Sequence, residues 1–157
     1  MINLQFFTQE DFSRLNYALD ENQSQFAATV ERALLNIERR EDNDAFPITI
    51  MKDNTPAGFF VLDFGEDKFE LTDNKDSVLV RSLSVNPEMQ GTGIGKGAMM
   101  KVDDFVRENF QNCNEIVLAV NQRNESAYHI YLENGYIYEG KTRIGRSGPQ
   151  YLMYKKL

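Results

Sequence analysis

Residues 90–97 read Gln-Gly-Thr-Gly-Ile-Gly-Lys-Gly and are the most informative stretch of the sequence. They follow a strand-like segment at 77–86 and lead into a segment with helical spacing of apolar residues, from about residue 93 to 109. A helix N-terminus exposes unpaired N–H groups and the positive end of its dipole, and glycines allow close approach of an anion. We therefore expect a pyrophosphate site built mainly from backbone N–H groups. The residues concerned are Gln90, Gly91, Thr92, Gly93, Ile94, Gly95 and Lys96.

Two familiar nucleotide-binding motifs do not fit this stretch. A Walker A loop requires Ser or Thr after its lysine, but Gly97 follows Lys96. The dinucleotide fingerprint Gly-x-Gly-x-x-Gly fails because the glycines alternate with other residues, and because the stretch lies past the middle of the chain. The remaining alternative to a phosphate site is a flexible turn that only joins a strand to a helix.

Length and charge limit the class of protein. The chain has 157 residues with 41% hydrophobic and 26% charged residues, which predicts one globular domain over residues 1–157. Lys plus Arg is 17 and Asp plus Glu is 24, so the net charge is 17 − 24 = −7. An acidic chain argues against duplex nucleic acid or an anionic membrane as partner and leaves room for a cationic substrate.

The cysteine and histidine counts exclude two further classes of site. A single cysteine, Cys113, cannot form an internal disulfide, and a single histidine, His129, makes a His/Cys zinc site implausible. No apolar run reaches the roughly 18 residues of a membrane span, and the N-terminus does not resemble a signal peptide. We expect a cytoplasmic, metal-free protein, with the roles of Cys113 and His129 open.

The predicted elements alternate between strands and helices in an order typical of a mixed sheet covered by helices. Helices are expected from residue 8, with Phe12, Leu15 and Leu19 on one face, and at 24–40, 93–109 and 124–134. Strands are expected at 2–7, 46–51, 57–64, 77–86, 115–120, 136–144 and 150–155. The fold class is therefore α+β, with a mixed sheet.

Two sequence blocks resemble the GNAT superfamily of N-acetyltransferases. Residues 85–95 are similar to its acetyl-CoA signature Arg/Gln-x-x-Gly-x-Gly/Ala, with Gln90, Gly93 and Gly95 at the matching positions. The stretch at 121–127, followed by Tyr131, Gly135 and Tyr136, resembles the superfamily's Asn-x-x-Ala-x-x-x-Tyr…Gly-Phe/Tyr block. The order of predicted elements is similar across nearly the whole chain.

This resemblance implies a fold and a reaction. The fold would be a twisted, mostly antiparallel sheet with helices on both faces and a splayed parallel strand pair at the cofactor site. The reaction would transfer an acetyl group from acetyl-CoA directly to a primary amine, through a tetrahedral intermediate and without a metal. Such a transfer needs an anchored thioester, an oxyanion donor, a deprotonated amine and a proton for the leaving thiolate.

The resemblance also implies roles for individual residues. The backbone from Leu83 to Val85 would pair with the pantetheine arm, and the Val85 N–H is the candidate oxyanion donor, its alternative being an ordinary sheet hydrogen bond. Asn124 would bind the cofactor arm, although it also suits a helix N-cap. Tyr131 is the candidate general acid and cofactor contact, with core packing as its alternative.

The general base is left open. Many relatives carry a carboxylate on the strand that corresponds to 77–85, but this chain has Arg81, Ser82, Leu83 and Ser84 there. Ordered water, Ser82 or Ser84, or a carboxylate such as Asp63 or Glu66 could serve. Strand alternation predicts Arg81, Leu83 and Val85 on one side and the two serines on the other.

The acceptor is also left open. A polyamine-like amine, an amino acid, a peptide, an aminoglycoside or a protein amine all fit, and Arg81 would favour a carboxylate-bearing acceptor if it entered the pocket. A homodimer is possible. The alternative from another class is a non-catalytic module that binds acyl-CoA as a sensor.

Overall fold

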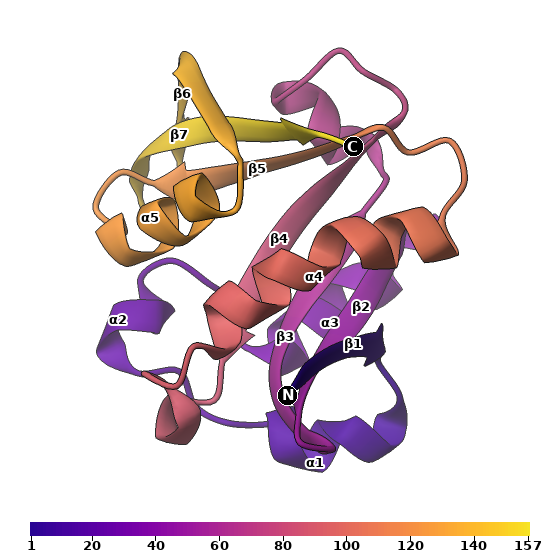
Figure 1. The fold of residues 1–157 in the computed structure, drawn as a ribbon, viewed down its shortest axis with the longest axis vertical. Coiled ribbons are helices and arrows are strands. Elements are labelled where there is room, and N and C mark those ends of the chain that lie inside the picture. Colours follow the sequence, from indigo (N-terminus) through magenta and orange to yellow (C-terminus); the bar gives the residue numbers. More distant parts are fainter.

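The computed structural model describes residues 1–157, and all seven strands belong to one sheet. They are β1 Ile2–Phe6, β2 Ala45–Lys52, β3 Thr55–Asp63, β4 Ser77–Val85, β5 Glu115–Asn121, β6 Ile137–Gly145 and β7 Gly148–Lys156. The spatial order is β1-β2-β3-β4-β5-β7-β6 (Figure 1), and every neighbouring pair is antiparallel except β4 and β5. The mixed, mostly antiparallel sheet expected from the sequence is confirmed.

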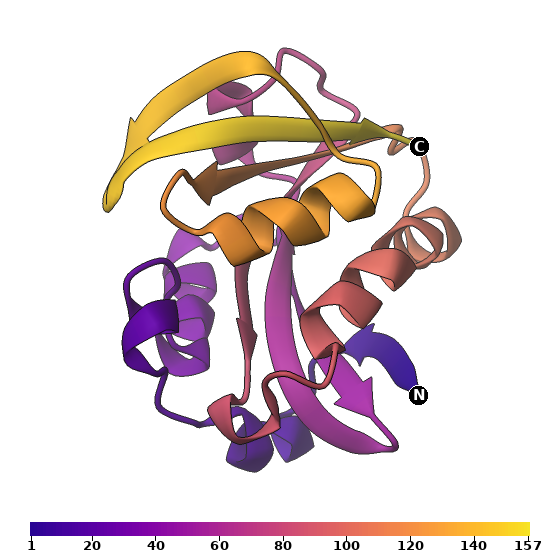
Figure 2. The same ribbon diagram turned by 60° about the vertical axis from the view of Figure 1, so that its left-hand side comes forward.

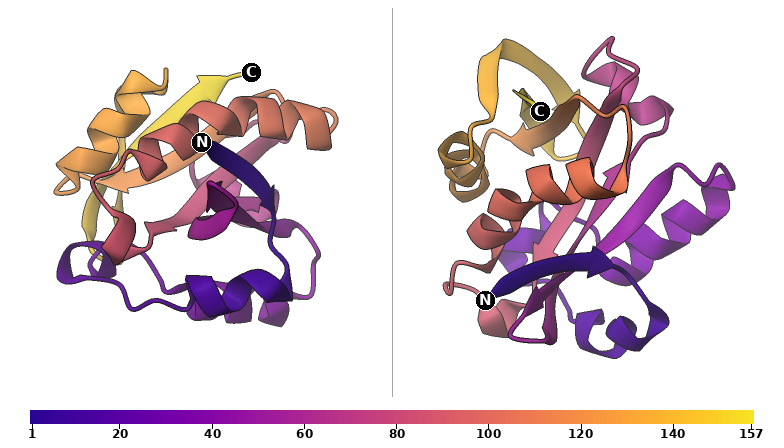
Figure 3. Two further views of the ribbon diagram at one scale, coloured as in Figure 1. Left: turned by 60° about the horizontal axis from the view of Figure 1, so that its bottom comes forward. Right: turned by 45° about the vertical axis from the view of Figure 1, so that its right-hand side comes forward.

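Helices cover both faces of this sheet, as Figure 3 shows. They are α1 Phe12–Leu15, α2 Glu21–Ser24, α3 Val30–Arg40, α4 Ile94–Asn109 and α5 Glu125–Glu133, with 3-10 turns η1 Gln9–Asp11, η2 Glu66–Glu70 and η3 Pro87–Met89. The larger apolar core includes side chains of α4 and α5, and a smaller core joins α1 and α3 to β3. The sheet therefore has two distinct sides, and each carries its own core.

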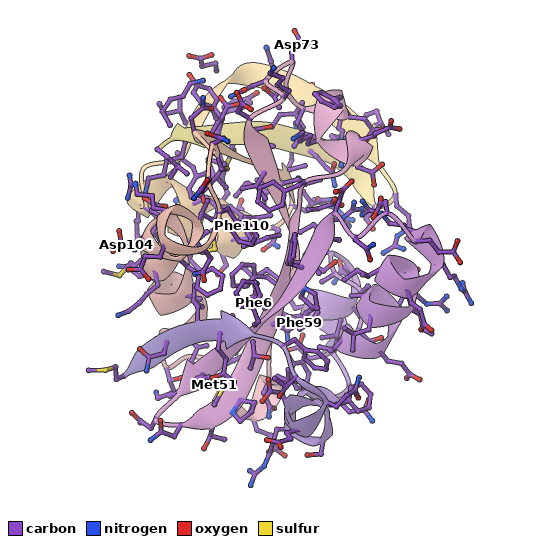
Figure 4. All side chains as sticks on the ribbon, turned by 90° about the vertical axis from the view of Figure 1, so that its right-hand side faces the viewer. Phe6, Met51, Phe59, Asp73, Asp104 and Phe110 are labelled. Carbon is purple, nitrogen blue, oxygen red and sulfur yellow. The ribbon has the colours of Figure 1, made fainter.

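Aromatic side chains mark the two sides. Phe6 lies beside Phe105 and Phe110 of the α4 region, with ring centroids 5.2 and 6.0 Å away. Phe59, on β3, is fully buried in the smaller core with Leu15 and Val30. Figure 4 shows Phe6 and Phe110 near each other and Phe59 on the α3 side. Contacts of Phe6 with Phe105 and Phe110 hold α4 on one face, and burial of Phe59 holds α1 and α3 on the other.

The helix predicted over 24–40 is interrupted. Residues 21–24 form the short α2, and α3 starts only at Val30, where the Thr29 hydroxyl accepts from the Arg32 N–H. Threonine at an N-cap stabilises a new helix start, so it competes with continuation of the preceding turn. The first helix also ends at Leu15, which leaves Leu19 outside it.

A bulge in β4 overturns the expected alternation of its side chains. Phe59 pairs with Ser84 and Val61 with Arg81, so two residues of β4 face the single Phe60, and Ser82 has a left-handed φ of 61°. An extra residue in one strand shifts the following side chains to the other face. Arg81 and Ser84 consequently share the α3 side, while Leu83 and Val85 pack against the larger core.

Strands β4 and β5 separate soon after they meet. Their parallel register covers only Ser77–Leu79 against Glu115–Val117, although β4 continues to Val85 and β5 to Asn121. Figure 1 shows the two strands diverging from their common end. The splayed parallel pair is confirmed, and it leaves the far half of β4 without a strand on that edge.

Candidate active site

The glycine-rich turn before α4 presents unpaired N–H groups, as expected at a helix start. The N–H groups of residues 91–96 donate to no acceptor within the protein, and the first bond of the helix runs from the Gly97 N–H to the Gly93 carbonyl. Gly91 and Gly93 hold left-handed φ values of 80° and 79°. The Gln90 N–H differs from the others, because it reaches the Pro87 carbonyl at 3.5 Å.

The space around this turn suits a phosphate group. A Cβ on Gly91 or Gly93 would meet no atom within 4 Å, so solvent or a ligand can reach the backbone there. At Gly95 a Cβ would lie 3.9 Å from Ile130 and 4.0 Å from Val85, which places the turn next to both α5 and the end of β4. The Lys96 ammonium lies 2.8 Å from Glu133 of α5. The residues present therefore fit a pyrophosphate beside the open strand edge.

The backbone of Val85 is paired with a side chain instead of a strand. Its N–H donates to the Gln23 Oε1 at 3.0 Å, and its carbonyl accepts from the Gln23 Nε2 at 2.9 Å. Asn86 donates its N–H to the Ala57 carbonyl of the β3 side, so by alternation the Val85 groups face away from β3. The bond made by the Val85 N–H is thus not an ordinary sheet hydrogen bond.

Tyr131 lies on α5 within the larger core, with only 7% of its surface exposed. Its ring centroid is 5.7 Å from that of Tyr136, and its hydroxyl makes no side-chain hydrogen bond. Burial raises the pKa of Tyr131 to about 12, so the phenol is protonated near neutral pH. It packs in the core and also carries a proton that it can donate.

Asn124 occupies the N-cap of α5. Its Oδ1 accepts from the Ala127 N–H at 3.3 Å, which is the structural role considered from the sequence. Its side-chain nitrogen makes no hydrogen bond within the protein and therefore retains a donor for a ligand.

Arg81 is held by two carboxylates. Its Nη1 lies 3.1 Å from Asp63 and 2.7 Å from Asp67, and Arg40 binds the same Asp63 carboxylate at 2.7 Å. Burial alone would raise the pKa of Asp63, but hydrogen bonds from Arg40, Gly65 and Arg81 outweigh it and hold that pKa below its usual value. Asp63 is thus an ion-pair centre and a poor candidate for a general base.

Other polar groups lie on the same side of β4. The Tyr17 hydroxyl lies 2.8 Å from the Ser84 Oγ, and burial raises the pKa of Tyr17 to about 12. Glu66 is exposed at the start of η2. The sequence reasoning missed Gln23 and Tyr17, because both reach β4 from more than 60 residues away and no local motif marks them.

The remaining candidates lie outside this group. Burial raises the pKa of the Cys113 thiol, and its Sγ lies 3.6 Å from the Glu115 carbonyl. His129 is exposed and lies beside Tyr128. No three His, Cys, Asp or Glu side chains gather in a way that could hold a metal ion. None of the helices combines the length and the hydropathy that a transmembrane helix needs. A cavity of about 360 Å³ lies at the closed end of the splay, between Leu71, Glu115 and Leu152.

The uncovered β4 edge, the unpaired N–H groups of the glycine-rich turn and the buried Tyr131 are the features that an acyl-CoA-dependent transferase would use. The sequence profile of the acetyltransferase (GNAT) family matches residues 8–136. The chain belongs to this family and is an N-acetyltransferase that uses acetyl-CoA. A relative from Bacillus subtilis (strain 168), the uncharacterised N-acetyltransferase YbbJ, is 32% identical over 98% of this chain and 96% of that protein.

Solved structures share the fold at low sequence identity. The Vibrio cholerae spermidine N-acetyltransferase in complex with CoA and spermine has a TM-score of 0.72 and 20% identity, over 99% of this chain and 95% of that one. The aminoglycoside acetyltransferase AAC(6')-Ib in complex with coenzyme A and kanamycin has a TM-score of 0.76 and 16% identity, over the same shares.

Replacing Gly93 by valine tests the phosphate-binding turn. A β-branched residue is strained at a φ of 79°, and its side chain would cover the exposed N–H groups. Loss of two charge-assisted hydrogen bonds predicts CoA binding weaker by at least about 100-fold in isothermal titration calorimetry. Gly140→Val is the matched control, since Gly140 in β6 also has a positive φ and open space. Normal CoA affinity in Gly93→Val would refute this site.

Asp63→Asn tests the ion-pair centre through protein stability. Removing the charge leaves Arg40 and Arg81 without their shared partner, which predicts a loss of about 2–3 kcal/mol of unfolding free energy at pH 7. Because the folded-state pKa of Asp63 is depressed, its contribution is present above the unfolded pKa of about 3.9 and is lost as the pH falls through the folded value. Urea denaturation from pH 7 down to 3 should therefore show the difference between variant and wild type shrinking. Asp73→Asn, at an exposed residue without a partner, should change nothing.

Proposed function

We propose that this N-acetyltransferase acts on a primary amine of a small polycationic molecule. The observation that carries the proposal is the ion pairing of Arg81, which Asp63 and Asp67 both neutralise. An arginine bound in this way does not present an unpaired charge to a substrate carboxylate, which removes the reason to favour amino acids. The net charge of −7 favours approach of a cation.

The proposed cofactor-binding residues lie along the uncovered edge of β4 and in the turn before α4. The N–H groups of Gly91, Thr92, Gly93, Ile94, Gly95 and Lys96 would bind the pyrophosphate, with Gln90 at the edge of this set. The backbone of Leu83 and Val85 would hold the pantetheine arm like an added strand, because alternate residues direct their peptide groups to the same edge. The side-chain nitrogen of Asn124 would donate to the same arm.

The catalytic residues of this proposal are Val85 and Tyr131. Bound acetyl-CoA supplies the activated acetyl group. The Val85 N–H would donate to the acyl oxygen as negative charge develops there. The protonated Tyr131 phenol would donate its proton to the departing sulfur, which the high pKa of the buried hydroxyl permits near neutral pH.

A panel of amines tests the acceptor class. Release of free CoA thiol should follow addition of spermine or kanamycin, with kcat/KM at least about tenfold higher than for single amino acids, which is about 1.4 kcal/mol of discrimination. Equal or higher values for amino acids would refute the polycationic acceptor. Absence of thiol release with any amine, in protein that binds CoA, would refute the proposed reaction.

Tyr131→Phe tests the general acid. Loss of a positioned proton donor predicts a fall in kcat of about 100-fold, while CoA affinity changes by less than about twofold, because the ring still fills the core. The control is Tyr128→Phe on the same helix, whose ring packs on Tyr151 and whose hydroxyl makes no hydrogen bond. An unchanged kcat in Tyr131→Phe would show that this phenol is not the acid.

A further inference from the structure

The short helix α2 bridges the two strands of the splay. From its middle, Gln23 makes both hydrogen bonds with the Val85 backbone of β4. From the segment that follows α2, Phe26 lies under the Arg123 guanidinium, which is 5.7 Å from the ring centroid and belongs to the loop after β5. Figure 2 shows α2 beside the open end of the splay, below α5. One short segment thus contacts both sides of the opening.

The Gln23 side chain has the chemistry of a peptide unit. Its carboxamide offers one carbonyl acceptor and one N–H donor side by side, and it pairs with the N–H and carbonyl of a single residue as a neighbouring strand would. The pantetheine arm of CoA also carries amide groups. Acetyl-CoA that lies along the β4 edge would need the same two backbone groups of Val85, the N–H for its acyl oxygen and the carbonyl for an amide N–H of its arm.

We propose that Gln23 is a displaceable latch, which occupies the pantetheine-binding edge of β4 until CoA replaces it. This inference rests on the proposed function, because it assigns the Val85 edge to the cofactor arm. Binding of CoA and pairing of Gln23 with Val85 are then mutually exclusive. Entry of the cofactor releases α2 from β4.

The chain around Gln23 is built to move as a unit. The Asp20 carboxylate caps α2 by accepting from the Gln23 N–H. The short helix therefore keeps this cap when the Gln23 side chain dissociates from Val85. Residues 25–29 separate α2 from the independently capped α3. No side chain between residues 16 and 29 is buried, and the only one of them that packs against the smaller core is Tyr17, ahead of α2. Release of Gln23 therefore does not require either core to open.

Calorimetric titration of CoA into Gln23→Ala tests the latch. In the wild type, CoA must break the two hydrogen bonds between Gln23 and Val85 before it binds. Because Gln23→Ala lacks these bonds, we expect it to bind CoA about 5- to 30-fold more tightly than the wild type. Gln25→Ala is the matched control, because the Gln25 side chain bonds only the Glu21 carbonyl of its own helix. Its CoA affinity should equal that of the wild type.

Amide hydrogen exchange at Val85 gives a second readout that needs no turnover. Without ligand, the Val85 N–H should exchange at least about tenfold faster in Gln23→Ala than in the wild type, and acetyl-CoA, whose acyl oxygen accepts from this N–H, should protect it equally in both proteins. If Gln23→Ala is folded and its Val85 N–H exchanges faster, but its CoA affinity is equal to or weaker than that of the wild type, the latch is refuted and the proposed function is not. A wild type that binds no CoA would overturn the proposed function together with it.

Discussion

The site depends on one edge of β4, where the backbone N–H and carbonyl groups of Val85 have no neighbouring strand to pair with. Strands β4 and β5 pair over three residues and then diverge, so β4 runs on to Val85 with one edge that no strand covers. Backbone N–H and carbonyl groups that are withdrawn from water need partners. Here a side-chain amide from α2 provides them for Val85. An edge that a side chain can satisfy can equally be satisfied by an extended ligand that carries amides.

The other features of the site gather around this edge. The turn before α4 lies close to Val85, so a ligand that follows the edge reaches a set of unpaired N–H groups. In the proposed function these groups would bind the pyrophosphate through local dipoles, so a net charge of −7 would not prevent binding of a polyanionic cofactor. On the other side of β4, the carboxylates of Asp63 and Asp67 neutralise Arg81 and leave no unpaired arginine there.

Local patterns in the sequence predict the parts of the molecule that local forces decide. The glycine-rich turn, the start of α4 near Gly93 and the Gly135 end of α5 follow from backbone conformations that glycine favours, and the structure shows positive φ at both glycines. The mostly antiparallel sheet with one splayed parallel pair follows from the resemblance to the family. Apolar spacing and short local motifs are sufficient to predict the turn and these helix ends from the sequence.

Long-range contacts decide the rest. The bulge in β4 includes Ser82, whose positive φ no spacing rule in the sequence predicts. The bulge places Ser84 on the same side of the sheet as Arg81, where strict alternation predicts opposite sides. The partners of Arg81 lie 14 and 18 residues away, and Gln23 lies 62 residues from Val85. A helix predicted over 24–40 is broken because Thr29 caps a new start. Such pairings depend on the assembled sheet and not on the neighbouring sequence.

The most direct measurement of the central claim is a crystal structure of the protein with bound CoA. The account predicts that the pantetheine arm lies along Leu83–Val85 with hydrogen bonds to the Val85 backbone, that the pyrophosphate contacts the N–H groups of residues 91–96, and that Gln23 has left Val85. CoA bound in the cavity between Leu71 and Leu152, or bound elsewhere with Gln23 still paired to Val85, would contradict it.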